Sequence, residues 1–247
     1  MANAFFTPPP AVNEAPLSYA PGTPEREDLQ AVIKRMKSEQ RDVPMTIGGQ
    51  KITTGNKVPM HPPHELKHTL GHYYKGGPEH VNMAIEAALK AKPKWEAMPW
   101  QERAAIFLRA ADLITGPYRS EMNAATMLGQ SKTPHQSEIE AVAELADFFR
   151  FNVQYMMDIY EDQPLSEPGS NIWNRVEYRP LEGFLLAITP FNFTAIAGNL
   201  PGAPALMGNT VIWKPAETQV YAAGLLMQIL EEAGLPEGVI NLLLVDG

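Results

Sequence analysis

Hydrophobic residues after position 180 occur in short runs separated by segments with helical spacing. Three of these runs have the length of buried strands: 183–189, 210–213 and 239–245. The segments between them, 195–206 and 219–233, fit helices, and Gly234 marks the expected end of the second. This alternating order predicts an α/β fold with a parallel sheet and right-handed crossovers. We expect the strand at 239–245 to form an open edge of that sheet, leaving apolar surface exposed at Ile240, Leu242, Leu243 and Leu244.

Three amphipathic helices are predicted before the sheet. The first begins near Pro78 and should break or end at Pro93, and the second covers 101–115. The third begins at Thr133, because a threonine, a proline and then Gln136 form a capping-box pattern. Its apolar seam is predicted to contain Ile139, Val142, Ala146, Phe149, Val153, Met156 and Tyr160.

The region before residue 78 carries weaker signals. A short amphipathic helix is predicted at 25–40, and glycines and prolines between 45 and 74 favour hairpins or loops. The Pro- and Ala-rich residues 1–23 predict a poorly ordered arm that lies on something larger. We therefore divide the chain into an arm with a short helix at 1–42 and a domain at 43–247. That domain contains a helical part at 78–162 and a βαβαβ part at 183–247.

Composition narrows the class of protein. The chain has 247 residues, of which 45% are hydrophobic and 19% charged, as is typical of a globular protein. Its net charge is −8 and its basic residues are scattered, which argues against nucleic-acid binding. It contains no apolar run long enough for a membrane helix, so we expect no membrane partner. The start matches neither a secretory leader nor an organelle presequence, so we expect a cytoplasmic protein, or a matrix protein if the source is eukaryotic.

The chain contains no cysteine, which excludes disulfides, thiolate metal sites and a cysteine nucleophile within these residues. Four histidines lie in a spacing that could suit a metal: His61, His64, His68 and His72. Pro62-Pro63 and Gly71 oppose a helix there, and no carboxylate cluster completes a site. We therefore predict no metal centre.

The turns that follow the first two predicted strands are the most informative segments, because open parallel sheets bind ligands at the carboxyl ends of their strands. The first reads Thr-Pro-Phe-Asn-Phe-Thr over 189–194, and the second reads Trp-Lys-Pro-Ala-Glu over 213–217. Together they resemble the aldehyde dehydrogenase superfamily. Residues 143–152, 181–184, 190–196, 198–200 and 203–209 are similar to its pyrroline-5-carboxylate dehydrogenase branch. The resemblance covers roughly 43–247; residues 171–178 form a longer connection than usual, and Glu217 stands where the branch often has Asp.

The resemblance implies a role for individual residues. Asn192 is implied as the side-chain donor of an oxyanion hole, a role that suits an uncharged amide. NAD is the implied cofactor, and the residues implied to hold it are Thr189, Pro190, Phe191, Lys214, Ala216 and Glu217. Phe193 is implied to pack on the aliphatic part of the substrate, and Glu144 to face its amino group. The structural alternatives are an Asn tolerated in a turn, a solvated Lys214, a core Phe193, and a solvated helix face for Glu144 together with Glu138 and Glu140.

The fold implied is aldehyde-dehydrogenase-like, with a partial Rossmann-type sheet preceded by a helical segment and the arm. The activity implied is oxidation of L-glutamate 5-semialdehyde to glutamate with NAD, in a homo-oligomer. On this reading the chain is an amino-terminal half, and the family's nucleophilic Cys, general-base Glu and Gly-rich loop lie beyond Gly247, so the chain alone should be inactive. The alternatives are a non-catalytic nucleotide-binding or interaction module, one half of a split enzyme, or another aldehyde dehydrogenase branch.

Overall fold

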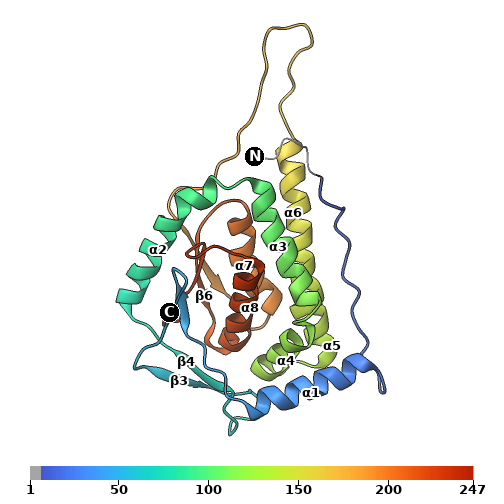
Figure 1. The fold of residues 1–247 in the computed structure, drawn as a ribbon, viewed down its shortest axis with the longest axis vertical. Coiled ribbons are helices and arrows are strands. Elements are labelled where there is room, and N and C mark those ends of the chain that lie inside the picture. The colour runs from blue at the N-terminus through green and yellow to red at the C-terminus, as the bar shows by residue number, and fades with distance from the viewer. Residues whose placement is uncertain (1–6, 247) are drawn as a thin grey trace.

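In the computed structural model, which describes residues 7–246, helices cover both faces of one central sheet (Figure 1). Residues 1–6 of the predicted arm and Gly247 lie outside the described residues. The sheet has five strands, in the spatial order β2 (Gln50–Ile52), β1 (Met45–Ile47), β7 (Ile240–Leu242), β6 (Val211–Pro215) and β5 (Leu185–Thr189). Strands β5, β6 and β7 are parallel and are joined by helices α7 (Thr194–Leu206) and α8 (Val220–Ala233). The predicted α/β order is therefore confirmed.

Strand β7 does not form the open edge that the sequence predicts. The hairpin of β1 and β2 adds to the sheet beside it, and Thr46 of β1 pairs antiparallel with Leu242. Asn241 strengthens this junction, since its Oδ1 accepts the N–H of Gly48 at 2.8 Å. The four apolar residues expected to be exposed are all buried: Ile240, Leu242, Leu243 and Leu244. The prediction was wrong because the strand that covers this edge lies almost two hundred residues earlier in the chain.

Strand β5 is an edge strand instead. It was predicted to be buried, but it buries only one of its faces, and Leu186 and Ile188 on the other face are 58% and 63% exposed. Alternate residues of a strand point to opposite faces, so a strand with one covered face shows alternating buried and exposed side chains. Before β5, residues 162–184 form a long loop without regular structure that projects from the molecule (Figure 1).

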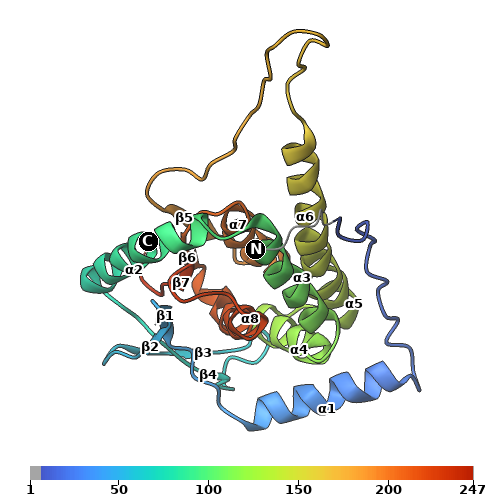
Figure 2. The same cartoon turned by 45° about the horizontal axis from the view of Figure 1, so that its top comes forward.

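Helix α2 (Pro78–Glu96) lies on the opposite side of the sheet from α8 (Figure 2). Pro93 does not end this helix, contrary to the prediction. The carbonyl of Pro93 accepts the N–H of Ala97, and the last turn carries Trp95, which is buried and donates its Nε1 hydrogen to the carbonyl of Ala205 at 2.9 Å. We infer that this tertiary contact offsets the hydrogen bond that the proline cannot donate.

Helix α3 (Trp100–Thr115) matches the second predicted helix, but the next helix, α4 (Arg119–Gln130), was not predicted. Its buried face contains mostly small or polar residues: Met122, Asn123, Ala124, Ala125, Thr126, Leu128 and Gly129. Such a face gives only a weak hydrophobic period, although the helix packs closely against α1 (Pro24–Ser38) and α8.

The third predicted helix begins as expected, because Thr133 Oγ1 accepts the N–H of Gln136 and completes a capping box. It consists of α5 (Pro134–Ser137), a π-helical stretch over Glu138–Glu144, and α6 (Leu145–Glu161). A π-helical turn holds more residues than an α-helical one, so it rotates the buried face. Ile139 is therefore 41% exposed, while Glu138 and Glu140 are 0% and 3% exposed. The prediction that Ile139 joins the seam was wrong. The alternative that Glu138 and Glu140 lie on a solvated helix face was also wrong. The rest of the predicted seam is buried from Val142 to Met156.

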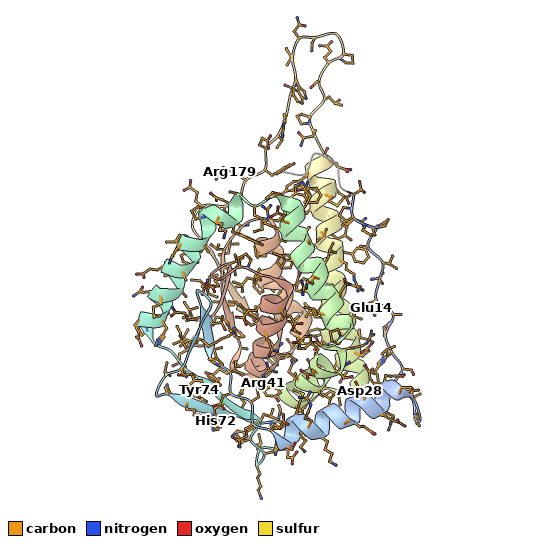
Figure 3. All side chains as sticks on the ribbon, in the orientation of Figure 1. Glu14, Asp28, Arg41, His72, Tyr74 and Arg179 are labelled. Carbon is orange, nitrogen blue, oxygen red and sulfur yellow. The ribbon has the colours of Figure 1, made fainter. Side chains whose placement is uncertain are left out.

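The arm lies against the rest of the molecule: its described residues run beside α6, and α1 packs beside α4 (Figures 1 and 2). The side chain of Gln154 accepts the N–H of Ala11, and Asp147 accepts the N–H of Glu14, both at 2.8 Å. Figure 3 shows Glu14 beside these helices, and its carboxylate pairs with Arg119 and Arg150 at 2.8 Å each. Tyr19 is buried. Residues 7–23 are therefore held by specific contacts, in contrast to the poorly ordered arm that we predicted.

The remaining strands, β3 (Lys57–Met60) and β4 (Gly71–Tyr74), form the separate hairpin expected in the 45–74 region. None of the helices in residues 7–246 combines the length and the apolar character required to cross a membrane.

Candidate functional site

The two turns singled out in the sequence lie next to each other at the carboxyl edge of the sheet. Strands β5 and β6 pair in register, so Thr189 stands opposite Pro215 where both strands end. The indole Nε1 of Trp213 donates to Thr189 Oγ1 at 3.0 Å and joins the two strand ends through buried side chains. Parallel strands place the following turns on one edge, where α/β folds bind their ligands.

Asn192 lies in the turn between β5 and α7 and is exposed. Within residues 7–246 its side-chain amide has no hydrogen-bond partner, so both of its N–H donors remain available to a ligand. Its neighbour Phe191 is exposed, and Pro190 is half-buried. Phe193 ends the turn as the N-cap residue of α7. The turn thus presents a neutral donor in front of the sheet.

The second turn starts on β6 with Lys214, which is half-buried, and continues through Ala216 to the short 3-10 helix η2 (Glu217–Gln219). Glu217 is exposed and faces Lys75 at 3.5 Å. Lys75, which follows β4, also pairs with Asp246, and the hydrogen bond with Asp246 raises the pKa of Lys75. The second turn therefore offers the cation of Lys214 and the carboxylate of Glu217 to a polar ligand. Lys75 lies next to that carboxylate as a second cation.

A buried hydrogen-bond centre that the sequence analysis missed connects the two turns. Thr194 Oγ1 lies 2.8 Å from Gln130 Nε2 and 3.1 Å from Gln219 Nε2, and both amides donate to it. The same oxygen lies 2.9 Å from Thr126 Oγ1, to which its own hydrogen can go. A hydroxyl accepts two hydrogen bonds and donates one, so Thr194 is fully satisfied. No sequence pattern could identify this centre, because the partners of Thr194 come from α4 and η2, far away in the sequence.

Two residues implied to contact substrate, Phe193 and Glu144, share Lys132 as a neighbour. The Nζ of Lys132 lies 4.1 Å from the centroid of the Phe193 ring, which is cation–π geometry. Glu144 ends the π-helical stretch and is half-buried. Burial raises the pKa of Glu144, while the charge of Lys132 opposes that shift. A cationic group that docked near Glu144 would favour its ionised form.

The histidines singled out in the sequence face different partners. His61 Nδ1 lies 2.8 Å from the carbonyl of His68, and His64 Nδ1 lies 2.8 Å from Ser131 Oγ. His72 and Tyr74 both belong to β4 (Figure 3), and the carboxylate of Asp42 accepts hydrogen bonds from the backbone N–H of His72 and from the hydroxyl of Tyr74. No group of three or more potential metal ligands of the His, Cys, Asp or Glu type gathers anywhere in the part of the chain that the structure describes.

Comparisons with known proteins point to one family. A family model described as "Aldehyde dehydrogenase family" matches residues 51–247. A delta-1-pyrroline-5-carboxylate dehydrogenase from Agaricus bisporus is 55% identical over 242 residues, which are 96% of this chain and 44% of that protein. The mitochondrial enzyme of that name from Homo sapiens is 46% identical over 235 residues, which are 95% of this chain and 41% of the relative.

Solved structures give the same result for the fold. The crystal structure of the delta-pyrroline-5-carboxylate dehydrogenase from Mycobacterium tuberculosis bound with NAD superposes with a TM-score of 0.95 at 52% identity. The match covers 99% of this chain and 45% of that one. A 1-pyrroline-5-carboxylate dehydrogenase from Thermus with bound NAD superposes with a TM-score of 0.87 at 30% identity, over 96% of this chain and 46% of that one. This chain thus spans less than half the length of the relatives it matches, and by sequence and by fold it belongs to the aldehyde dehydrogenase family.

Proposed function

We propose that this chain forms the NAD-binding and oxyanion-binding part of a dehydrogenase that oxidises L-glutamate 5-semialdehyde to glutamate. The observation that carries the proposal is the pairing of Thr189 with Pro215, which brings the Asn192 turn and the Lys214–Glu217 turn to one edge of a parallel sheet. Relatives named delta-1-pyrroline-5-carboxylate dehydrogenase support the substrate class.

Asn192 would act on the reacting carbonyl. When a nucleophile adds to an aldehyde, negative charge develops on its oxygen, and a fixed N–H donor lowers the energy of that state. The Asn192 amide is exposed and unpaired among the described residues, and it brings no competing charge or titration. It is the one group of the proposed site that would touch the reacting atoms.

The second turn fits the polar part of a dinucleotide. The carboxylate of Glu217 is exposed and can accept hydrogen bonds from ribose hydroxyls, while Lys214 and the backbone of Ala216 can donate to them. Thr189, Pro190 and Phe191 line the neighbouring strand end. Bound NAD would supply the hydride acceptor. The residues of this chain would orient it against the Asn192 turn.

Phe193 and Glu144 are proposed to select the substrate. Phe193 would pack on the methylene groups of the semialdehyde, and Glu144 would pair with its ammonium group. The shared neighbour Lys132 supports a common location for the two residues.

We propose the domain boundaries, the oligomeric state and the cellular location on the same basis. Residues 43–247 would be the NAD-binding domain, with its helical part at 78–162 and its βαβαβ part at 183–247, and residues 1–42 its arm and short helix. The enzyme would be a cytoplasmic homo-oligomer, or a matrix one in a eukaryote; the Homo sapiens relative is named as a mitochondrial enzyme.

The test is a substrate profile of the dehydrogenase that contains this chain, with NAD and with NADP. We expect the highest kcat/KM for glutamate semialdehyde with NAD, and a preference for an unrelated aldehyde would place the enzyme in another branch. The cysteine-free composition favours one other candidate, a non-catalytic nucleotide-binding module or half of a split enzyme. Micromolar NAD affinity of the 247 residues alone, measured by calorimetry, would support that candidate.

A further inference from the structure

A buried carboxylate from a distant helix caps the N-terminus of α7. Glu140, which is 3% exposed, accepts the N–H of Ala195 on its Oε2 at 3.1 Å. The first N–H groups of a helix have no partner within the helix and carry partial positive charge. The N-cap residue of α7 is Phe193, whose side chain cannot accept a hydrogen bond. The capping oxygen therefore has to come from another part of the chain.

Lys132 completes this arrangement from the side of the turn. Its Nζ lies 2.6 Å from Glu140 Oε1 and stands over the ring of Phe193. Its side chain is only 15% exposed. The ion pair thus contacts the last residue of the Asn192 turn through Lys132 and the second residue of α7 through Glu140.

The π-helical stretch over Glu138–Glu144 is what brings Glu140 inward. It leaves the apolar Ile139 exposed and places a carboxylate in the interior. Burial raises the pKa of Glu140 despite the charge of Lys132, so the ionised form carries a desolvation cost. π-helical turns of this kind occur often at functional sites. An apolar residue at position 140 would avoid the cost, which indicates a role for the carboxylate other than core packing.

We propose that Lys132 and Glu140 are positioning residues for Asn192. They fix the start of α7 and the ring of Phe193, and so hold the turn over Pro190–Phe193 in the conformation that presents the Asn192 amide. Neither residue touches the reacting atoms. The inference rests on the proposed function only in taking Asn192 as the oxyanion donor.

The first measurement needs no activity. Amide hydrogen exchange is followed by mass spectrometry or NMR in the 247-residue chain and in the variants Glu140→Ala, Glu140→Gln and Lys132→Met. The Ala195 amide depends on Glu140 for its hydrogen bond, so Glu140→Ala should speed its exchange at least about tenfold. Glu140→Gln keeps an acceptor oxygen and should have a smaller effect, while amides of the α3 core stay unchanged.

The second measurement is steady-state kinetics of the dehydrogenase that contains this chain. Displacing an oxyanion donor from its hydrogen-bonding position destabilises the transition state more than the ground state. We therefore expect kcat to fall about 10- to 100-fold. KM for the aldehyde and for NAD should stay within about threefold. Lys132→Arg keeps the charge and the ring contact and should recover most of kcat. The matched control is Lys37→Met, which removes a surface ion pair with Glu65 and should leave both readouts unchanged.

Faster exchange at Ala195 combined with lower kcat and rescue by Lys132→Arg supports the proposal. Unchanged exchange in Glu140→Ala overturns it, and so does faster exchange with unchanged kcat. If Glu140→Ala does not melt cooperatively, the proposal is tested by the exchange rate of the Ala195 amide and by kcat in Glu140→Gln and Lys132→Met. Every aldehyde forms the same oxyanion, so the loss should be equal for any aldehyde that the enzyme accepts. A preference for a different aldehyde would refute the proposed substrate and leave this test intact.

Discussion

Trp213 donates its indole N–H to the hydroxyl of Thr189 at 3.0 Å, so the ends of the two strands that carry the candidate site are joined by buried side chains as well as by the sheet. The bond uses one acceptor position of the hydroxyl and leaves its hydrogen free. Thr189 therefore holds the indole of Trp213 in place at the strand end.

Trp213→Phe tests this link. The variant removes the hydrogen bond and some buried ring volume, so we expect the free energy of unfolding to fall by about 2 kcal/mol in urea denaturation. Trp173→Phe is the control because Trp173 is 81% exposed in the projecting loop. Thr189→Val in the Trp213→Phe background should cost less than it does in the wild type. Additive losses would argue against the link.

The arm is predicted to depend on Glu138. This buried carboxylate pairs with Arg119 and accepts hydrogen bonds from Tyr19 Oη at 2.7 Å and the N–H of Leu17 at 2.8 Å. Glu138→Ala leaves Arg119 without this partner and should cost about 3–5 kcal/mol. Tyr19→Phe should cost about 2 kcal/mol, the range for a hydrogen bond to a charged group.

Limited proteolysis, together with chemical denaturation, measures the effect on the arm. Both variants should speed cleavage within residues 7–23, while Glu167→Ala in the exposed loop serves as the control. Wild-type cleavage rates in Glu138→Ala would show that Glu138 does not hold the arm.

Asp42 should make stability depend on pH in the acid range. Partial burial opposes its ionisation, but hydrogen bonds from Lys57, Tyr74 and His72 outweigh that effect and lower its pKa from 3.8 to about 2. The folded state thus binds this proton less tightly than the unfolded state does. The stabilisation is present above pH 3.8 and is lost as the pH falls toward about 2.

Asp42→Asn should therefore be less stable than the wild type at neutral pH, and the difference should shrink between pH 4 and pH 2. Urea denaturation at a series of pH values measures it, with Asp162→Asn at the exposed end of α6 as the control. A constant difference across that range would mean that Asp42 does not titrate there.

The 247 residues alone should show no dehydrogenase activity. They contain no cysteine, and an oxyanion donor has nothing to stabilise until a nucleophile has attacked the carbonyl. NADH formation by the purified chain with glutamate semialdehyde should stay at the level of a protein-free blank. Turnover that co-purifies with the chain would disprove the expectation.

Asn192→Ala in the dehydrogenase that contains this chain should lower kcat about 100- to 1000-fold, the usual loss for one oxyanion-hole donor. KM should change less, because the donor acts mainly in the transition state. Asn82→Ala, on the exposed face of α2, is the matched control. A kcat within a few-fold of the wild type would remove Asn192 from the mechanism.

The features that the sequence predicted correctly depend on neighbours in the chain. The Thr133 capping box, the helix end at Gly234 and the order of β5, α7, β6, α8 and β7 each follow from residues within a few positions of one another. The two turns at the strand ends could be located for the same reason, since a parallel sheet brings the ends of its strands to one edge.

The features that only the tertiary structure decided depend on residues that are distant in the sequence. Strand β7 is covered by β1, Pro93 remains inside α2 while Trp95 reaches Ala205, and the small-residue helix α4 packs between α1 and α8. Glu140 is buried because its partner is the N-terminus of α7, 55 residues later. Hydrophobic periodicity reports which face of a segment avoids water, but it carries no information about which distant group will meet that face. The sequence therefore determined the βαβαβ order and the place of the candidate site, while the fold decided which buried polar groups hold that site in position.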